Sequence, residues 1–158
     1  MSENYQKILV RYFSKVLDEI VVETLWTKII DAEKGIYKID NIPFYGPPFS
    51  TDDIIFAEYD EIEERITFRN VIEHSGNSTI QVVVLDENQS VENLRDEFQK
   101  LGCESEGLGS NYFVMEILLK NNYYPIFEKL QKLELDEIIS FAEPDISEKH
   151  VMDKQTCS

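Results

Sequence analysis

Few residues of this 158-residue chain have the types and spacing that catalysis needs. His74 is the only histidine inside the predicted fold, because His150 lies in a polar tail, and general base catalysis would require a group that orients its ring. The adjacent Glu73 points to the opposite face of a strand and is poorly placed for this. Cys103 follows a predicted helix, whose negative end raises the pKa of a thiol. We therefore expect no catalytic residue and no enzyme activity.

The turn Ser75–Thr79 carries hydroxyl and amide groups that can form an anion-binding nest. The net charge of −16 opposes anion binding, and no lysine of the P-loop type follows the turn. We expect a hairpin turn held by side-chain hydrogen bonds to the backbone, with a second role as a fixed hinge. The two cysteines and two histidines lack the spacing of zinc ligands, so neither metal nor cofactor is expected.

Carboxylates are most concentrated between Asp52 and Glu64. Their spacing lacks the alternating ligands and central glycine of a calcium loop, which argues against metal binding. Two interpretations remain, a solvated charged turn and an electrostatic face for a protein partner. The predicted partner-binding residues are Asp52, Asp53, Glu58, Asp60, Glu61, Glu63 and Glu64.

The balance of 31 acidic against 15 basic residues excludes some classes of partner. Non-specific nucleic-acid binding needs cations that neutralise phosphates, and anionic membranes are disfavoured for the same reason. The charge is compatible with simple solubility, with attraction to a basic protein, or with mimicry of nucleic acid at the active site of a nucleic-acid-cleaving partner.

The expected location is the cytoplasm. No apolar run approaches the roughly 20 residues of a membrane span, and the start MSENYQKILVRYF lacks the apolar core and cleavage site of a signal peptide. Cys103 and Cys157 lie far apart in sequence, which is typical of reduced thiols.

An aromatic, proline-rich segment follows the first predicted hairpin. Prolines bar Ile42–Phe49 from a central strand, and its large side chains predict either an aromatic plug or one wall of a groove. The predicted groove residues are Phe44, Tyr45, Phe49, His74 and Asn77.

The first half of the chain is predicted to be a helix followed by a small β unit. Apolar residues at helical spacing in Asn4–Glu19 predict an amphipathic helix over residues 1–20. Residues 21–78 are predicted to form a small antiparallel β unit. Its strands are expected at Val21–Ile30, Ile36–Ile39, Asp52–Tyr59 and Arg65–Glu73.

The second half alternates strands and helices. Ile80–Leu85, Cys103–Glu106, Asn111–Leu119 and Ile138–Ala142 are expected strands, with helices beginning near Ser90 and Asn122. This order predicts a ferredoxin-like βαββαβ unit over residues 79–144. The predicted class is α+β, with a flexible tail over residues 145–158.

Four short segments together resemble a known family: Leu25-Trp26, Ile42–Gly46, Asp53–Ile55 and Ser75–Thr79. The chain is similar to the bacterial domain-of-unknown-function 4265 family, from Glu23 to the end of the second helix. Its members pair a Leu-Trp strand with an aromatic-glycine loop, an acidic-aliphatic strand and a Ser-Gly-His-Ser-Thr turn. Asn77 replaces that histidine here, which puts a histidine-based role for the turn in question. The resemblance implies no established activity.

The function predicted from the sequence is a non-catalytic acidic module that binds another protein. Its most specific form is an immunity protein (antitoxin) that neutralises a bacterial toxin, with a basic toxin as partner. The alternative is a regulatory or sensory domain that binds a small molecule at a helix–sheet edge, closed by Pro43–Phe49. An enzyme using His74 and a carboxylate is the third class considered.

Overall fold

The computed structural model describes residues 4–14 and 18–155. It divides into two compact units, Met1–Ser75 and Gly76–Ser158. The described residues form nine strands and three short helices, so the chain is mostly β. The predicted class, an α+β chain with an N-terminal helix and a ferredoxin-like βαββαβ unit, is therefore wrong. Two sheets account for the nine strands, and their pairings are antiparallel except where β1 meets β5.

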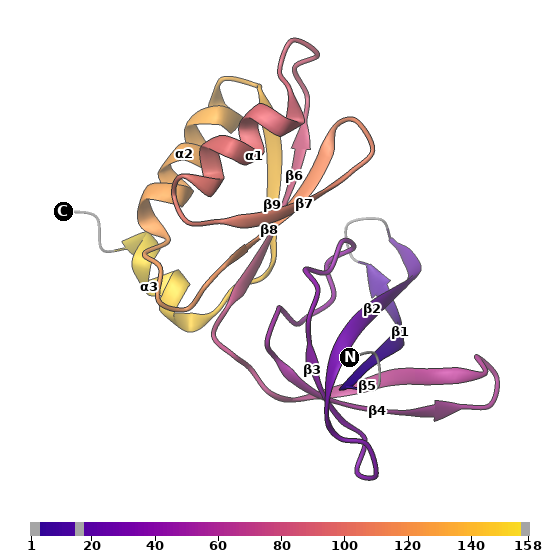
Figure 1. Ribbon diagram of the computed structural model, residues 1–158. Coiled ribbons are helices and arrows are strands. Elements are labelled where there is room, and N and C mark those ends of the chain that lie inside the picture. The colour runs from indigo at the N-terminus through magenta and orange to yellow at the C-terminus, as the bar shows by residue number, and fades with distance from the viewer. Residues whose placement is uncertain (1–3, 15–17, 156–158) are drawn as a thin grey trace. The chain divides into compact units, whose positions relative to one another are not determined.

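The first unit is a closed five-stranded barrel in the order β1-β2-β3-β4-β5 (Figure 1). Its strands are β1 (Tyr5–Ser14), β2 (Glu19–Asp31), β3 (Ile36–Ile39), β4 (Ile54–Asp60) and β5 (Arg65–Glu73). Successive strands pair antiparallel, and β1 closes the barrel against β5 through a parallel pairing of Leu9 with Thr67. The closing pair is parallel because an odd number of alternating strands returns in the starting direction.

The predicted N-terminal helix is instead strand β1. Ile8 and Val10 alternate with the exposed Lys7 and Arg11, which is the two-residue period of a strand. Ten consecutive residues of β1 pair with β2, and this long hairpin supplies cross-strand contacts that an isolated helix would lack. The apolar residues of this segment fit both periods, and the partner strand decided between them.

The core of the barrel consists of inward-facing side chains from its strands and of one loop residue, Phe49. The Phe49 ring packs on Phe68 with the ring centroids 4.9 Å apart. The buried members of the core are Ile8, Val10, Leu25, Tyr37, Ile39, Phe49, Ile55 and Ala57.

The second unit contains a four-stranded sheet in the order β7-β8-β6-β9, and every neighbouring pair is antiparallel. Its elements run β6 (Ser78–Val84), α1 (Val91–Gln99), β7 (Glu104–Leu108), β8 (Tyr112–Ile117), α2 (Tyr124–Leu135), β9 (Ile139–Asp145) and α3 (Glu148–Gln155). Helices α1 and α2 lie on the same side of the sheet (Figure 1). Their apolar faces and one face of the sheet form a separate core that includes Leu94, Phe98, Phe113, Ile126 and Leu130.

Local signals explain where the first two helices begin. The Ser90 hydroxyl accepts a hydrogen bond from the Asn93 N–H at 3.2 Å and caps α1, as its sequence position indicates. In α2, Pro125 occupies the first turn, where its missing N–H removes no helical hydrogen bond. Asn122 accepts from the Tyr124 N–H at 3.0 Å, although the N-cap position itself is Tyr123.

The predicted flexible tail, residues 145–158, is also wrong over its described part. Residues 148–155 form helix α3, and His150 on this helix is fully buried. Lys149 donates to the Asn121 carbonyl at 2.8 Å, and Asp153 accepts from the Tyr123 N–H at 2.9 Å. These contacts attach α3 to the segment before α2, which a local reading of a polar sequence could not reveal.

Within the described ranges, no helix has the length and apolar character required to cross a membrane.

Candidate functional site

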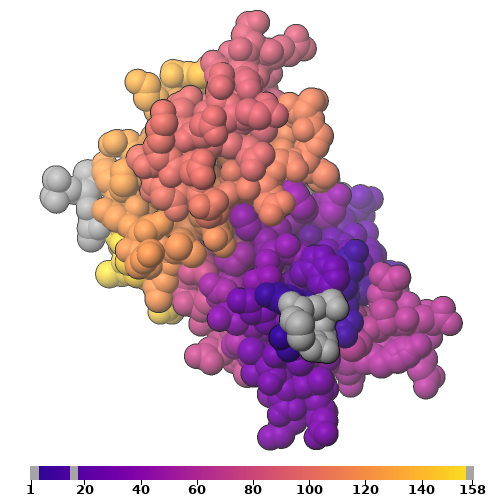
Figure 2. Space-filling view, in the orientation of Figure 1, coloured from indigo at the N-terminus to yellow at the C-terminus, as the bar shows by residue number. Residues whose placement is uncertain are grey.

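The acidic hairpin of β4 and β5 extends beyond the rest of the barrel (Figures 1 and 2), and three of its six carboxylates form ion pairs. Arg69 donates to Glu58 and to Asp60 at 2.9 Å each, and Arg11 donates to Glu63 at 3.0 Å. Asp60 also accepts the Glu63 N–H, and these hydrogen bonds hold the pKa of its carboxyl below the usual value. This pairing lowers the negative charge that the hairpin offers a basic partner.

The remaining predicted partner-binding residues fall into three environments. Asp52 is exposed and lies 3.9 Å from Lys38 Nζ. Glu61 and Glu64 are exposed, and neither forms an ion pair within the described residues. Asp53 is fully buried and cannot belong to an electrostatic surface, so its assignment to the partner-binding face is wrong.

Asp53 is instead the centre of a hydrogen-bond cluster at the end of β5. Its carboxylate accepts the Ser50 N–H at 3.0 Å and the Ser75 N–H at 2.8 Å. The Ser75 hydroxyl lies 2.9 Å from the same carboxylate and 2.8 Å from the Thr51 carbonyl. Asp52, the residue before it, has a positive φ of 67°, which bends the chain so that Asp53 turns inward. The buried charge is therefore compensated by several donors.

His74 is held by this cluster. Its Nδ1 lies 3.1 Å from Asp53 Oδ2, while the side chain remains 61% exposed. Because a carboxylate only accepts, His74 Nδ1 is the donor in this hydrogen bond. The orienting carboxylate comes from a position 21 residues earlier, which the search for a neighbour of His74 in the sequence missed.

The three predicted groove residues of the aromatic loop have structural roles. Phe49 fills the barrel core, and the backbone of Phe44 and Tyr45 is hydrogen-bonded to the barrel. Phe49 is fully buried in the barrel core. The Phe44 and Tyr45 N–H groups each donate to Glu23 at 3.1 Å, and Tyr12 Oη donates to the same carboxylate at 3.2 Å. Burial raises the pKa of Glu23, and these hydrogen bonds oppose the increase.

Asn77, the last predicted groove residue, belongs to the second unit. Its side chain is buried, and its Oδ1 accepts the Leu119 N–H at 2.9 Å. Asn77 therefore satisfies a backbone donor after β8, which is a structural role. The turn Ser75–Thr79 contains the division between the two units.

A surface that sequence reasoning missed covers the outside of β1 and β2, and we term it the outer strip. Its members are the outward-facing residues Lys7, Arg11 and Phe13 on β1 and Ile20, Val22, Trp26 and Lys28 on β2. Four of these are large apolar side chains with exposed fractions of 57% for Phe13, 58% for Ile20, 44% for Val22 and 46% for Trp26. The alternation of exposed and buried residues in β2 could have indicated this surface. The prediction of a helix for residues 1–20 hid it, because β2 then had no neighbouring strand on that side.

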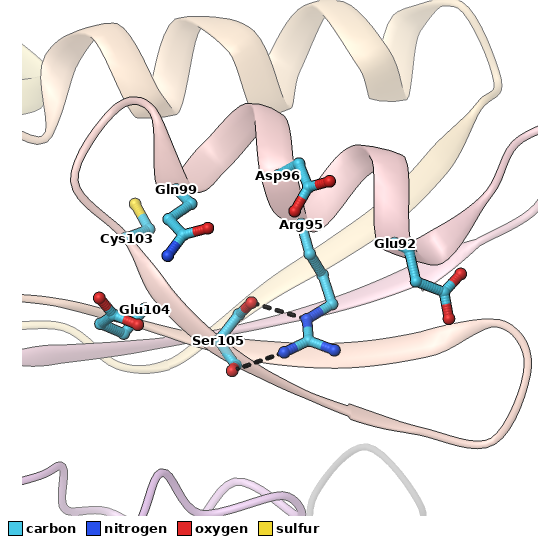
Figure 3. Close-up of a pocket in the computed structure, with 7 residues that line it drawn as sticks. All are labelled: Glu92, Arg95, Asp96, Gln99, Cys103, Glu104 and Ser105. Atoms are coloured by element: carbon cyan, nitrogen blue, oxygen red, sulfur yellow. Dashed lines mark hydrogen bonds between the residues drawn. The ribbon is translucent and has the colours of Figure 1, made fainter.

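The second unit contains a cavity of about 170 Å³ between α1 and the edge strand β7 (Figure 3). Arg95 reaches from α1 to β7, where Nε donates to Ser105 Oγ at 2.8 Å and Nη2 to the Ser105 carbonyl at 2.9 Å. Asp96, Gln99 and Glu104 also line the cavity. Cys103 also lines the cavity, and burial raises the pKa of its thiol to about 12, which disfavours the reactive thiolate form.

His150 lies at the centre of a second polar cluster, buried under α3. Its Nε2 is 3.0 Å from the Leu118 carbonyl and its Nδ1 is 2.6 Å from Ser78 Oγ. The carbonyl only accepts, so Nε2 carries the proton and Nδ1 accepts from the Ser78 hydroxyl. Ser78 Oγ in turn accepts the Ser147 N–H at 2.8 Å. Both side chains are fully buried, and their hydrogen bond joins α3 to β6.

These features define a mostly β protein of two units with an exposed apolar and basic strip on its barrel. The chain belongs to the family described as Domain of unknown function (DUF4265), whose model matches residues 23–141. This confirms the resemblance found in the sequence. A solved structure described as "Novel crystal structure of a hypothetical protein from Neisseria gonorrhoeae" is similar, with 25% identity and a TM-score of 0.77. The match covers 90% of this chain and 95% of the other, and no curated protein matches.

Proposed function

We propose that this chain is a non-catalytic protein-binding module that contacts its partner through the outer strip. The observation that carries this proposal is the group of four large apolar side chains on the outward side of one hairpin, each between 44% and 58% exposed. Large apolar side chains that stay exposed on one face of a hairpin mark an interaction site, because exposing them to water is unfavourable.

The residue types of the strip support the same function. Tryptophan and arginine are enriched among the residues that dominate binding energy at protein interfaces, and Trp26 and Arg11 both lie on the strip. Leu25, the neighbour of Trp26, is buried in the barrel core and has a packing role. Trp26 is exposed, so core packing does not account for a tryptophan at this position. The rigid β1–β2 pairing holds these side chains in place before a partner arrives, which reduces the entropic cost of binding.

The most specific form of the proposal is an immunity protein that neutralises a bacterial toxin. The small size of the chain and its exposed outer strip support this form. The test is growth of cells that express a candidate toxin with and without this chain. Toxicity that persists with the chain present would contradict the immunity form for that toxin.

The binding surface is tested by substitution. Tagged wild-type chain is incubated with lysate of its native cells at low and moderate salt, and the retained protein is purified and its affinity measured by calorimetry. Trp26→Ser with Val22→Ser should weaken binding by at least about tenfold, as expected for a loss of 1.4 kcal/mol or more at a hot spot. Leu135→Ser is the matched control, because Leu135 is 83% exposed on α2 of the other unit. Unchanged affinity in the strip variant would overturn the proposal.

A second candidate function is small-molecule binding at the cavity between α1 and β7, which lies at a helix–sheet edge. Its volume of about 170 Å³ is below the roughly 300–1,000 Å³ of most ligand pockets, so it would hold only a fragment. A thermal-shift screen of metabolites, repeated with Gln99→Ala and Glu104→Gln, tests it. A rise in melting temperature that disappears in these variants would favour this function over the first.

A further inference from the structure

The charge of the outer strip is opposite to the charge of the chain. On the outward side of β1 and β2, five cross-strand pairs carry three cations and no carboxylate, although acidic residues outnumber basic ones by 31 to 15 in the whole chain. These positions are Tyr5, Lys7, Leu9, Arg11 and Phe13 on β1 and Ile20, Val22, Thr24, Trp26 and Lys28 on β2.

The cations alternate with the apolar side chains. Lys7 is directly opposite Trp26, and its Nζ lies 5.7 Å from the centre of the ring. Arg11 is opposite Val22, and Lys28 is opposite Tyr5. Arg11 is paired with Glu63, whereas Lys7 and Lys28 form no ion pair within the described residues. Two ammonium groups therefore remain able to bind carboxylates from outside.

The arrangement of charged and apolar side chains favours some binding partners of the strip over others. Two copies of the strip that met face to face would bring their cations together, which opposes a symmetric dimer through this surface. Nucleic acid would meet three cations but also the field of a chain with net charge −16. A protein with a complementary apolar and acidic face satisfies both features of the strip.

We propose that the partner of the outer strip is a protein whose contact face is apolar and carries carboxylates that pair with Lys7 and Lys28. This inference rests on the proposed function and states the chemistry of its partner. It assigns binding to an acidic face, in place of the basic partner that the overall charge predicts. The acidic β4–β5 hairpin then borders the interface through the Arg11–Glu63 pair and discriminates against partners with carboxylates in the wrong place.

The local charge can be measured without a partner, because Trp26 is the only tryptophan. The experiment measures how strongly iodide and caesium quench its fluorescence at equal ionic strength. A positive strip should make the quenching constant for iodide about twice that for caesium or more, despite the negative net charge. In Lys7→Glu with Lys28→Glu the preference should reverse. Equal quenching by both ions in the wild-type chain would show that the strip has no positive potential and would overturn the inference.

The contribution to binding is measured with the protein purified on the wild-type chain. Lys7→Glu with Lys28→Glu should weaken its affinity at low salt by about tenfold or more, mostly through slower association. Lys34→Glu with Lys132→Glu is the matched control, since it makes the same change in net charge at exposed positions that do not belong to the strip. The control should remain within about twofold of the wild type. Circular dichroism melts of all variants establish that they fold.

The outcomes separate the two proposals. If Trp26→Ser with Val22→Ser weakens binding and the lysine reversal leaves it unchanged or tightens it, the partner face is not acidic and this inference fails while the proposed function stands. If neither change affects binding, or if no protein is retained, both fail. Loss of binding in both variants, with the control unaffected, supports both.

Discussion

The two histidines of this chain have opposite environments. His74, at the end of the barrel, is 61% exposed and donates through Nδ1 to a buried carboxylate, Asp53. His150, under α3, is fully buried and uses both ring nitrogens, one toward the Leu118 carbonyl and one toward the Ser78 hydroxyl. Each ring is held by its hydrogen-bond partners, but only the His74 side chain is exposed.

The two histidines show that a buried ring and an exposed ring have hydrogen-bond partners of different charge. The buried ring has neutral groups on both sides, and burial lowers the pKa of His150, so it remains uncharged at neutral pH. The exposed ring has a charged partner, whose own burial is compensated by backbone N–H groups. In the first cluster the buried acid is the structural centre, and in the second the histidine is.

The largest expected effect comes from removing the centre of the first cluster. Asp53→Ala should lower the free energy of unfolding of the barrel by about 2–4 kcal/mol, because the Ser50 and Ser75 N–H groups lose their acceptor in a buried place. Urea unfolding followed by Trp26 fluorescence reports on this unit. Asp52→Asn is the control, since Asp52 is exposed and asparagine tolerates its positive φ. A loss of similar size in both variants would remove Asp53 from its central role.

Ser78→Ala tests the second cluster. The substitution removes the donor to His150 Nδ1 and the acceptor of the Ser147 N–H, and it should cost about 1–3 kcal/mol. Hydrogen exchange in α3 should accelerate, because Ser78 provides two of the hydrogen bonds that attach this helix and its first turn to β6. The matched change Ser140→Ala, at an exposed position of β9, should leave that exchange rate unchanged. Slow exchange in both variants would contradict the role of Ser78.

The pH dependence of the second unit follows from the lowered pKa of His150. The unfolded chain takes up a proton near pH 6.5, which the folded unit takes up only at lower pH, so stability decreases as pH falls below about 6.5. Each unit by which the pKa is lowered corresponds to about 1.4 kcal/mol. The charged groups around the ring are Lys149 and Asp153 on α3, and the pKa of Asp153 is lowered mainly by its hydrogen bonds to Lys149 and Tyr123, against the effect of burial.

Hydrogen exchange of α3 between pH 7.5 and 5.5, corrected for intrinsic rates, measures this dependence. The wild-type chain should lose protection as the pH decreases. His150→Gln should be less stable at pH 7.5 but nearly independent of pH over this range, while His74→Gln keeps the wild-type slope. A slope that survives the loss of His150 would assign the dependence to other groups.

The smallest effect is expected at His74. His74→Ala removes one donor from Asp53, which keeps the Ser50 and Ser75 N–H groups, so the cost should be below about 1 kcal/mol. The same urea measurement as for Asp53→Ala gives the comparison directly. A cost close to that of Asp53→Ala would mean that the exposed ring contributes as much as the buried backbone donors.

The sequence predicted several features correctly because their signals are local. Ser90 caps α1, Pro125 lies in the first turn of α2, and the strongly apolar segment before Asn122 contains a strand. The family was also recognisable from short motifs around Trp26, Asp53 and Ser75, and the match to the family model confirms it. The partner-binding function and the absence of catalysis remain predictions.

Other features depended on contacts between residues far apart in the chain. The apolar pattern of residues 5–12 fits a helix as well as a strand, and pairing with β2 decided for the strand. Asp53 is in a run of acidic residues, yet it is buried because donors 21 and 22 residues later surround it. His150 is in a polar segment and is buried because its ring forms a hydrogen bond with the Ser78 hydroxyl, 72 residues earlier in the chain. The sequence alone determined where helices are capped and begin, since these depend on neighbouring residues, and it determined the net charge, which depends on composition only. Tertiary structure decided which charges are exposed and which surface is apolar, since burial depends on partners that local patterns do not encode.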